Sequence, residues 1–294
     1  MLIQHLADQE PSIVNPYLSS VVVTLMAIAL PGAAWADLRV GMIPDVNPSR
    51  LVRDARPLAT FLEKKTGQKV ELSVPTNYAA VVEALVNGQL DFAYLGGFTY
   101  LQAKRRAGVV PLVQRESDRH FHSLFLTQAR SSIHGLKDLR GRTFAFGDVN
   151  STSGHLMPAH FLRQAGIDPD HAFAQTLFTG GHDATALAIA NGKVDAGAID
   201  ETVFKRLLER GMIRADQVRV FYTTPAFPDY VWVARRGLDK AIQAKLAEAF
   251  LGLKPGHSSD RLLLDLLRGK SFVRAEAAAY RGLEQAALDE HLLR

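Results

Sequence analysis

From residue 37 onward, short apolar runs alternate with amphipathic stretches in which apolar positions recur at helical spacing. Apolar runs bounded by Gly, Pro or polar residues predict strands, and the amphipathic stretches predict helices. The first series contains the predicted strands Leu38–Ile43, Lys69–Val74 and Asp91–Leu95, and the predicted helices Arg50–Lys65, Tyr78–Asn87 and Phe98–Arg106. This alternation predicts an α/β fold with a largely parallel sheet.

The same alternation returns in the second half of the chain, after two consecutive predicted strands. Those two strands are Val109–Gln114 and Phe121–Gln128. The second series has strands Thr143–Gly147, Gln175–Phe178 and Val194–Ile199, and helices Ser153–Ala165, Asp183–Asn191 and Thr202–Arg210. Strands Val218–Tyr222 and Tyr230–Ala234 follow, and then helices Lys240–Leu253, Ser259–Arg268 and Ala275–Leu293.

Extended segments near 121–128 and 218–226 bracket the second series. Two strands that cross between lobes would produce this pattern, because the chain leaves one lobe, builds the other and returns. We therefore expect residues 37–125 with 227–294 to form lobe 1, and residues 126–226 to form lobe 2. Ligands of such proteins bind between the lobes, at the carboxyl ends of strands.

The N-terminus has the pattern of a secretory signal peptide. An apolar run at Leu18–Leu30 is too short for a membrane span, and Ala34-Trp35-Ala36 is a cleavage motif of small residues. Residues 1–17 lack the usual Lys or Arg, so a buried N-terminal helix is the alternative interpretation. Cleavage near Ala36 would give an exported, soluble periplasmic protein that is not an integral membrane protein.

Composition narrows the possible chemistry. The chain has no cysteine, which excludes disulfides, thiolate metal sites and a Cys nucleophile. The net charge is +4, and removal of residues 1–36, which contain two acidic residues and no Lys or Arg, would raise it to +6, which suits an anionic ligand. No block of Lys and Arg with interleaved aromatic residues is present, so nucleic acid is not an expected partner.

The most informative stretch runs from Phe144 to Gly154, where an apolar strand enters a loop rich in Gly, Asn, Ser and Thr before a helix. Free N–H groups and the positive dipole end at a helix start form an anion site together with nearby hydroxyls. Ser151, Thr152 and Ser153 supply three hydroxyls, whereas N-capping needs only one. The sequence leaves anion binding and an ordinary helix cap equally open here.

Two further segments have related features. Thr179–Asp183 contains two glycines and His182 at another helix start, where an ordinary loop with an exposed His is the alternative. Asp200 and Glu201 lie at the carboxyl end of a strand. Asp200 would suit an oxyanion that keeps a proton, because a carboxylate accepts that hydrogen bond. For Glu201 we favour a role as an acidic residue in the first helical turn.

No catalytic set is evident. The chain lacks a G-x-S-x-G elbow, an H-E-x-x-H motif and a phosphate-binding G-x-x-x-x-G-K-[ST] loop. His120 and His122 alternate on a predicted strand but have no further metal ligands nearby, so no metal or other cofactor is predicted. His122 lies where the chain is expected to cross between lobes, so it is a candidate cleft residue.

Together these motifs resemble the substrate-binding proteins of phosphonate, phosphite and phosphate ABC importers, a branch of the type II periplasmic binding proteins. The resemblance spans residues 37–290. Its markers are Gly147–Gly154, with Val149 where the family has Pro, then Gly181-His182-Asp183, Val194-Asp195 and Asp200-Glu201. It implies a two-lobed α/β fold, no enzymatic activity, and as partners a small phosphorus oxyanion and an ABC permease with its ATPase.

The resemblance also assigns roles to residues. It implies that Ser151, Thr152, Ser153 and His182 hold the ligand oxygens and that Asp200 accepts a hydrogen bond from the ligand. In lobe 1 it implies contacts from Tyr78, from Tyr94 or its neighbour Leu95, and from Asp229. The smaller Leu95-Gly96-Gly97 segment and Phe121-His122 depart from relatives, which leaves phosphite, phosphate, arsenate and several phosphonates open.

Two other classes of function fit part of the pattern. A protein with the same binding site could interact with a membrane histidine kinase in its ligand-bound conformation and act as a sensor subunit. An enzyme on the same fold would need a base or nucleophile at the ligand, and the candidate site offers only hydrogen-bonding groups. We expect a binding protein that works as a monomer.

Overall fold

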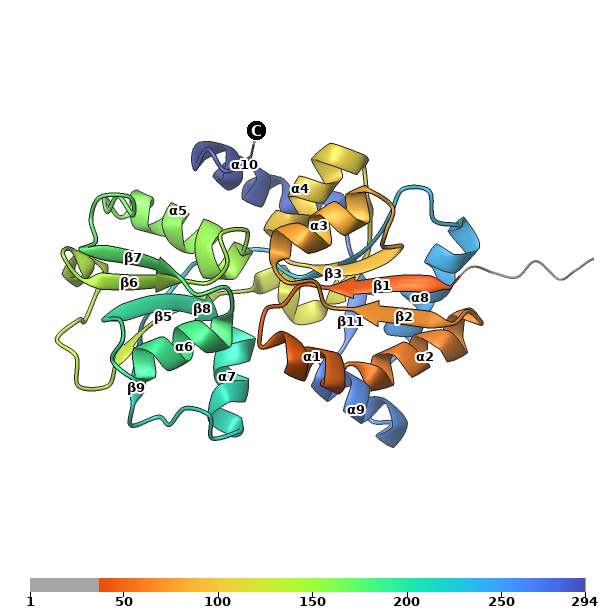
Figure 1. Cartoon of the computed structure of the whole chain (residues 1–294), viewed down its shortest axis with the longest axis horizontal. Helices are drawn as coiled ribbons and strands as arrows, with labels where there is room; N and C mark the ends of the chain where they lie inside the picture. The colour runs from red at the N-terminus through yellow and green to blue at the C-terminus, as the bar shows by residue number, and fades with distance from the viewer. Residues whose placement is uncertain (1–36, 294) are drawn as a thin grey trace, which may run out of the picture. The chain divides into compact units, whose positions relative to one another are not determined.

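Two β-sheets organise the described part of the chain, and helices pack on both (Figure 1). The computed structural model describes residues 37–293. The predicted signal peptide, residues 1–36, lies outside the described residues, so its cleavage stays a prediction. No helix within residues 37–293 is long and apolar enough to span a membrane.

The first sheet has six strands in the order β11-β4-β10-β3-β1-β2. Its strands are β1 (Leu38–Met42), β2 (Val70–Ser73), β3 (Phe92–Leu95), β4 (Val110–Arg115), β10 (Val231–Ala234) and β11 (Phe272–Arg274). Strand β1 pairs in parallel with β2 and β3, whereas β10 is antiparallel to β3 and β4, and β11 is antiparallel to β4. Every residue of β3 and β10 is buried, as expected for strands covered by helices on both faces.

Helices of this part are α1 (Pro48–Asp54), α2 (Arg56–Thr66), α3 (Tyr78–Val86), α4 (Gly97–Ala107), α8 (Lys240–Leu251), α9 (Ser258–Leu266) and α10 (Arg281–Asp289), with 3-10 turns η1 (Glu116–His120) and η4 (Ala277–Tyr280). Helices α3 and α4 pack on β1, β3 and β10, and α2 and α8 pack on β2 and β4. The core includes stacked Phe92 and Trp232, whose ring centroids are 4.8 Å apart. Aromatic pairs of this kind add stability beyond the burial of their area.

The second sheet has five strands in the order β7-β6-β8-β5-β9. Its strands are β5 (Ser123–Gln128), β6 (Thr143–Phe146), β7 (Gln175–Phe178), β8 (Ala196–Asp200) and β9 (Val218–Thr223). Strand β6 is parallel to β7 and β8, and β5 is antiparallel to β8 and β9. The associated helices are α5 (Met157–Gln164), α6 (His182–Ala190) and α7 (Glu201–Glu209), with turns η2 (Leu136–Leu139) and η3 (Thr152–Leu156).

Side chains of the second sheet alternate between its two faces, as the period of two along a strand requires. Phe144 and Phe146 of β6 point to the core that contains Leu162 of α5. Ala145 between them points to the opposite core, which contains Ile189 of α6. Figure 1 shows the same arrangement, with α5 on one side of the sheet and α6 on the other. The apolar pattern of the sequence therefore fixes which helix covers which face.

The chain crosses between the sheets twice, at Phe121 and Phe227. The two residues pair with each other through N–H to carbonyl bonds of 2.8 and 3.0 Å. We refer to the six-stranded sheet with its helices as lobe 1, and to the five-stranded sheet with its helices as lobe 2. The expected two-lobed fold with two crossings is confirmed. The crossings are shorter than predicted, because β5 and most of 218–226 belong to the lobe 2 sheet.

The expectation of largely parallel sheets was wrong, since both sheets are mixed. Each crossing delivers the chain to the carboxyl edge of the parallel strands, so the strand that begins there must run in the opposite direction. Strand β5 follows the crossing at Phe121, and β10 follows the crossing at Phe227. Both strands are antiparallel to a neighbour in the parallel group, β8 and β3 respectively.

Two predicted helices also differ from the structure. Arg50–Lys65 is divided into α1 and α2 at Ala55, because Pro57 in the first turn of α2 has no N–H to continue the ladder. The continuous helix predicted over Ala275–Leu293 is a 3-10 turn followed by α10. Just before it, β11 pairs with β4, and the Ala275 N–H extends this pairing to the Leu112 carbonyl at 3.1 Å.

Candidate functional site

The carboxyl ends of three parallel strands bring the candidate residues of lobe 2 together. Ser151, Thr152 and Ser153 follow β6, His182 follows β7, and Asp200 is the last residue of β8. All of these side chains are buried, with at most 2% of each residue exposed. Segments up to 49 residues apart in the sequence therefore meet at one edge of the sheet, where ligands of open α/β sheets bind.

A tight turn shapes the segment from Ser151 to Gly154. Ser151 caps it by accepting a hydrogen bond from the Gly154 N–H at 3.0 Å. A Cβ atom on Gly154 would lie 2.8 Å from the Ser151 Oγ and 2.9 Å from His182 Cε1, distances that force a shift. Glycine at this position therefore allows the turn and the start of α6 to pack together. The predicted helix Ser153–Ala165 begins here as the π-helical turn η3 and continues as α5.

Lobe 1 places its candidate residues at the carboxyl edge of β1, β2 and β3. Tyr78 begins α3, Tyr94 lies in β3, and Asp229 precedes β10. All are buried. The ring of Tyr94 stacks on that of Tyr230 with centroids 5.0 Å apart and planes 7° apart. The residues that the sequence assigned to lobe 1 thus lie at the same edge of their sheet.

The two lobes meet at the start of α4. The Phe98 N–H donates to the Thr152 Oγ1 across the lobes at 2.9 Å, and the Gly97 N–H donates to the Asp229 Oδ1 at 3.1 Å. Gly96 permits this approach, because a Cβ there would lie 3.0 Å from the Thr152 Oγ1. Since Thr152 accepts from Phe98, its own hydroxyl hydrogen is directed elsewhere, toward Asp229 or a ligand.

Most of the buried side-chain polar atoms that have no hydrogen-bond partner within residues 37–293 belong to this site. They are the Tyr78 and Tyr94 hydroxyls, the Ser153 hydroxyl, the Asp200 Oδ2 and the Asp229 Oδ2, whereas three others lie on Gln68, Tyr100 and Trp232. Buried polar groups in folded proteins are almost always hydrogen-bonded. Three hydroxyl donors and two carboxylate oxygens therefore converge here with their hydrogen-bonding capacity unused by the protein.

Asp200 is an ionised carboxylate with one oxygen in use and one free. Its Oδ1 caps α7 by accepting from the Thr202 and Val203 N–H groups at 2.5 and 2.9 Å. Burial raises the pKa of Asp200, but the positive charges of Arg268 and Arg115, the nearby His182 ring and the hydrogen bond from Thr202 outweigh burial and lower the pKa to about 2. The free Oδ2 is consequently a pure hydrogen-bond acceptor at neutral pH.

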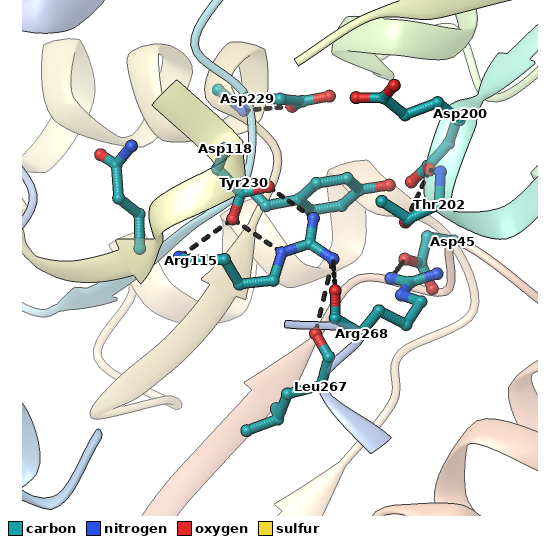
Figure 2. Close-up of polar contacts among 12 residues, drawn as sticks. Asp45, Arg115, Asp118, Asp200, Thr202, Asp229, Tyr230, Leu267 and Arg268 are labelled. Atoms are coloured by element: carbon teal, nitrogen blue, oxygen red, sulfur yellow. Dashed lines mark hydrogen bonds and ion pairs between the residues drawn. The ribbon is translucent and has the colours of Figure 1, made fainter. Parts of the chain in front are cut away.

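Asp229 has the opposite electrostatic character. Burial raises its pKa to about 7, although the Gly97 N–H and the nearby hydroxyls of Thr152 and Ser153 oppose the shift. Neither hydroxyl makes a hydrogen bond of normal geometry with Asp229, but both are close enough to lower its pKa. The negative charge of Asp200 adds to the upward shift. In Figure 2 the two carboxylates point toward each other.

His182 is neutral, with an assignable tautomer. Burial lowers its pKa, and nearby Asp200 and Asp45 only partly reverse the shift. Its Nδ1 accepts a hydrogen bond from the Asp200 N–H at 3.2 Å, so the ring hydrogen is on Nε2. Nε2 lies 3.4 Å from the Tyr230 hydroxyl. His182 therefore presents an N–H donor to the site, although its backbone N–H is already bonded to the Asp45 carbonyl at 2.9 Å.

Four charged or aromatic residues surround this site that the motifs did not identify: Asp45, Arg115, Tyr230 and Arg268 (Figure 2). Arg268 forms a partly buried ion pair with Asp45, in which only the Asp45 side chain is fully buried. Arg115 pairs with Asp118, with Nη2 and Oδ1 2.5 Å apart. Both guanidinium groups lie over the Tyr230 ring, at 5.0 Å for Arg115 and 5.6 Å for Arg268. Burial lowers the pKa of Arg115, but the Asp118 carboxylate raises it above its usual range.

His122 and Glu201 lie at the crossing rather than among the unsatisfied groups. The His122 Nδ1 is 2.8 Å from the Thr224 carbonyl, and the His122 N–H donates to the Glu201 carboxylate at 3.2 Å. Glu201 is in the first turn of α7. The contact of His122 with Thr224 therefore joins the two crossing segments, and the role of His122 toward a ligand stays a prediction.

Comparison with known proteins agrees with this architecture. The family described as "ABC transporter, phosphonate, periplasmic substrate-binding protein" matches residues 40–280. A probable ABC transporter phosphite-binding protein, PhnD1, from Prochlorococcus marinus is 33% identical over 260 residues, which cover 84% of this chain and 88% of that protein. The phosphate-import protein PhnD of Mycolicibacterium smegmatis is 35% identical over 226 residues, which cover 72% of this chain and 70% of that protein.

A solved structure shows the same fold. PhnD1 of Prochlorococcus marinus in complex with methylphosphonate aligns with a TM-score of 0.82 and 31% identity, covering 87% of this chain and 98% of that chain. The family match spans most of the chain, and the relatives align over nearly their whole length or a large part of it. The chain belongs to the family of periplasmic substrate-binding proteins of phosphonate-type ABC transporters.

Proposed function

We propose that this protein binds a small tetrahedral phosphorus oxyanion carrying at least one proton, without chemical turnover, and delivers it to an ABC importer. The supporting observation is the set of buried groups without partners: the hydroxyls of Tyr78, Tyr94 and Ser153 and the free oxygens of Asp200 and Asp229. Hydroxyls can donate to the oxygens of an oxyanion. An ionised carboxylate can only accept, so it requires a hydrogen on the ligand.

The chemistry of the relatives supports this class of ligand. One relative is named for phosphite and one for phosphate import, and the solved neighbour holds methylphosphonate. Each of these ligands has a tetrahedral phosphorus with oxygens and a fourth substituent that differs. Asp200 and the hydroxyls are suited to the oxygens that the ligands share. The fourth substituent then faces lobe 1, where Gly96 and the Tyr94–Tyr230 stack form the wall.

The proposed mechanism is capture by closure of the two lobes over the ligand. The anion binds first to Ser151–Ser153 and His182 on lobe 2, and lobe 1 then adds Tyr78, Tyr94 and Asp229. The motion would occur at the paired crossings Phe121 and Phe227, and such hinges consist of a few residues. After export to the periplasm, the closed monomer would dock on a permease coupled to an ATPase.

Ser153→Ala tests the proposed site directly. The Ser153 hydroxyl makes no hydrogen bond of normal geometry within the described residues, so its loss removes only its weak interaction with Asp229 from the ligand-free protein. If Ser153 donates to an oxyanion, affinity should fall roughly 10- to 100-fold, because a hydrogen bond to a charged group contributes about 1.5–3 kcal/mol. Isothermal titration calorimetry with phosphite, methylphosphonate and phosphate measures this change.

The control is Thr176→Ala, which removes an exposed hydroxyl on β7. It should leave affinity and thermal stability unchanged. Sulfate, which carries no proton at neutral pH, should bind the wild type much more weakly than phosphite. Equal affinity of Ser153→Ala and the wild type for the best ligand would contradict the proposed role of Ser153.

A further inference from the structure

His155 lies just after the hydroxyl-bearing segment Ser151–Ser153, outside the motifs that identified the site. Its Nδ1 is 2.7 Å from the Val149 carbonyl oxygen. A carbonyl oxygen can only accept a hydrogen bond, so the ring hydrogen is on Nδ1 and His155 is the donor. Burial lowers the pKa of the imidazole, so the ring is neutral at neutral pH and adds no charge to the site.

This hydrogen bond closes a loop around the three hydroxyl residues. Val149 precedes Ser151–Ser153 and His155 follows it, so the contact joins the two ends of the segment. In the same segment the Leu156 N–H donates to the Ser151 carbonyl at 3.0 Å, which is the spacing of the π turn η3. Single π turns are rare in proteins. A side-chain bond across the segment therefore restrains a backbone that has few hydrogen bonds of its own.

The imidazole of His155 is itself held by two aromatic neighbours. Its centroid is 5.0 Å from that of Phe146, the last residue of β6, and 4.9 Å from that of Phe178, the last residue of β7. Both pairs are edge-to-face, with planes 73° and 84° apart, which is a favoured geometry for aromatic rings. His155 thus connects the loop to the ends of two strands that deliver residues to the site.

Val149 has little else to hold it in place. The marker segment of the family has a proline here, which would fix φ near −65°. Val149 lacks this restraint, its residue is 48% exposed, and its N–H makes no hydrogen bond within residues 37–293. The next residue, Asn150, accepts from Gln102 of lobe 1 at 2.9 Å. The bond from His155 therefore fixes a residue that lies beside both the anion segment and a contact between the lobes.

We propose that His155 is a positioning residue that holds Ser151–Ser153 in the anion-binding geometry through its hydrogen bond to the Val149 carbonyl. This inference rests on the proposed function and extends it. In this chain the side-chain bond takes over the restraint that a proline at position 149 would supply. His155 acts on the ligand only through the backbone of the turn, so that the ligand does not have to order the turn when it binds.

Two substitutions separate the hydrogen bond of His155 from the packing of its ring. His155→Phe keeps an aromatic ring against Phe146 and Phe178 but removes the donor, so we expect phosphite affinity to fall roughly 3- to 10-fold. His155→Asn keeps a donor, since its Nδ2 can take the place of Nδ1, but removes the ring. It should bind phosphite more tightly than His155→Phe and yet melt at a lower temperature. A role in packing alone predicts the opposite order of affinities.

A rescue by proline tests the restraint itself. Val149→Pro limits the turn without the imidazole and removes no hydrogen bond of the Val149 N–H. Added to His155→Phe, it should return phosphite affinity to within about twofold of the wild type, because the two restraints act on the same turn. Val149→Pro alone should leave affinity unchanged, since His155 already holds the turn. Isothermal titration calorimetry on the wild type, both single variants and the double variant measures this cycle.

Hydrogen exchange of the ligand-free protein gives a measurement that needs no ligand. The Gly154 N–H donates to the Ser151 Oγ and the Leu156 N–H to the Ser151 carbonyl. Both amides should exchange about tenfold faster in His155→Phe than in the wild type, relative to the amides of β8, because the turn opens more often. In His155→Asn they should remain more protected than in His155→Phe.

Several results would overturn the role of His155. These are wild-type affinity and exchange in His155→Phe, an affinity of His155→Asn as low as that of His155→Phe, or a failure of Val149→Pro to restore binding to His155→Phe. Failure of every phosphorus oxyanion to bind the wild type would instead refute the proposed function. The exchange rates of the ligand-free proteins would then still decide whether His155 holds the turn.

Discussion

Asp229 shows how a single buried carboxyl group couples the proposed site to the stability of the protein. Asp200 lies on the opposite side of the site, and two negative charges there would repel each other, since neither is fully paired. The structure separates their ionisation: Asp200 has Arg268 and His182 nearby, whereas Asp229 has one backbone N–H and neutral hydroxyls. Groups whose pKa values are driven apart in this way are typical of functional sites.

The raised pKa of Asp229 predicts a stability gain for Asp229→Asn that depends on pH. Its folded pKa of about 7 exceeds its ordinary value of 3.8, so the folded state holds a proton that the unfolded state loses between these pH values. The associated stability is complete below about pH 4 and is lost as pH rises to about 7. An asparagine at position 229 does not ionise, so this loss of stability does not occur. Its side-chain oxygen can still accept the hydrogen bond from the Gly97 N–H.

We therefore expect ligand-free Asp229→Asn to unfold at higher denaturant concentration than the wild type at pH 8, with a gain of about 2–4 kcal/mol. At pH 4 the two proteins should differ little. Urea unfolding at both pH values measures the difference, and titrating groups that do not interact with Asp229 contribute equally to both proteins. The same gain at pH 4 and pH 8 would show that burial of the Asp229 charge is not the cause.

At the scale of elements, the proposed anion site depends on a turn that packs against a second helix start. The η3 turn and the first residue of α6 approach so closely that Gly154 has no room for a side chain. The close approach places the Ser151–Ser153 hydroxyls beside the His182 ring. Neither helix start alone provides this arrangement, since the His182 N–H is already used by Asp45.

Gly154→Ala should damage the site and the fold together. The added Cβ would lie 2.8 Å from the Ser151 Oγ and 3.2 Å from the Gly147 Cα, so the turn must move. We expect a loss of about 1–3 kcal/mol in stability, as for other overpacked positions, and a drop in phosphite affinity of roughly tenfold or more. Thermal unfolding and calorimetry measure the two effects.

Gly135→Ala is the matched control for this substitution in the same lobe. Gly135 has an extended backbone with φ of −158°, and an added Cβ would have nothing within 4 Å. Its stability and affinity should stay within about 0.5 kcal/mol of the wild type. If Gly154→Ala behaved like Gly135→Ala, the close packing of the two helix starts would not be required for binding.

Some elements could be predicted because their signals are local, and others could not. The strands of lobe 2 follow from short apolar runs bounded by Gly, Pro or polar residues, and the helix start near Ser151 follows from its run of hydroxyls, because the Ser151 side chain caps the turn η3 in the structure. The mixed direction of the sheets depends instead on where each crossing enters its sheet. Strand β11 has only three residues and is defined by its pairing with β4, which no local pattern reveals.

The same distinction applies to the site. The motifs indicated Ser151–Ser153, His182 and Asp200 because hydroxyls, glycines and carboxylates cluster locally at strand ends. Arg268 and Asp45 are 223 positions apart, and neither is in a recognisable motif. Their meeting depends on packing between α9 and the loop after β1. Long-range ion pairs of this kind become visible only in three dimensions.

At the scale of the whole molecule, direct contacts between the lobes would stabilise a closed form. Besides the Phe98–Thr152 bond, Gln102 donates to Asn150 at 2.9 Å and the Asn47 N–H donates to Asp183 at 3.0 Å. At the C-terminal end of α10, Glu290 reaches α5 of lobe 2. Contacts that exist only when the lobes meet favour closure, and the ligand must supply the remainder of the free energy.

The Glu290 contacts form one ionic part of this interface, and Arg210 of lobe 2 with Asp54 of lobe 1, 3.6 Å apart, forms another. Its Oε2 is 2.8 Å from the Arg163 Nε, its Oε1 is 3.6 Å from the His160 Nδ1, and only 4% of its side chain is exposed. Arg163 also pairs with Asp168 and Asp170 of its own lobe, so it stays in place when Glu290 is altered. Glu290→Gln therefore weakens the contact between lobes with little effect on either lobe alone.

We expect Glu290→Gln to shift the ligand-free protein toward an open form and to weaken phosphite binding about fivefold, since such an ion pair contributes about 1 kcal/mol. Small-angle X-ray scattering should give a larger radius of gyration for ligand-free Glu290→Gln than for the wild type, and the same radius for both at saturating ligand. Glu248→Gln is the control, because Glu248 and Arg274 form an exposed pair within lobe 1. If both variants match the wild type in radius and affinity, Glu290 does not contribute to closure, and the other contacts between the lobes must hold them together instead.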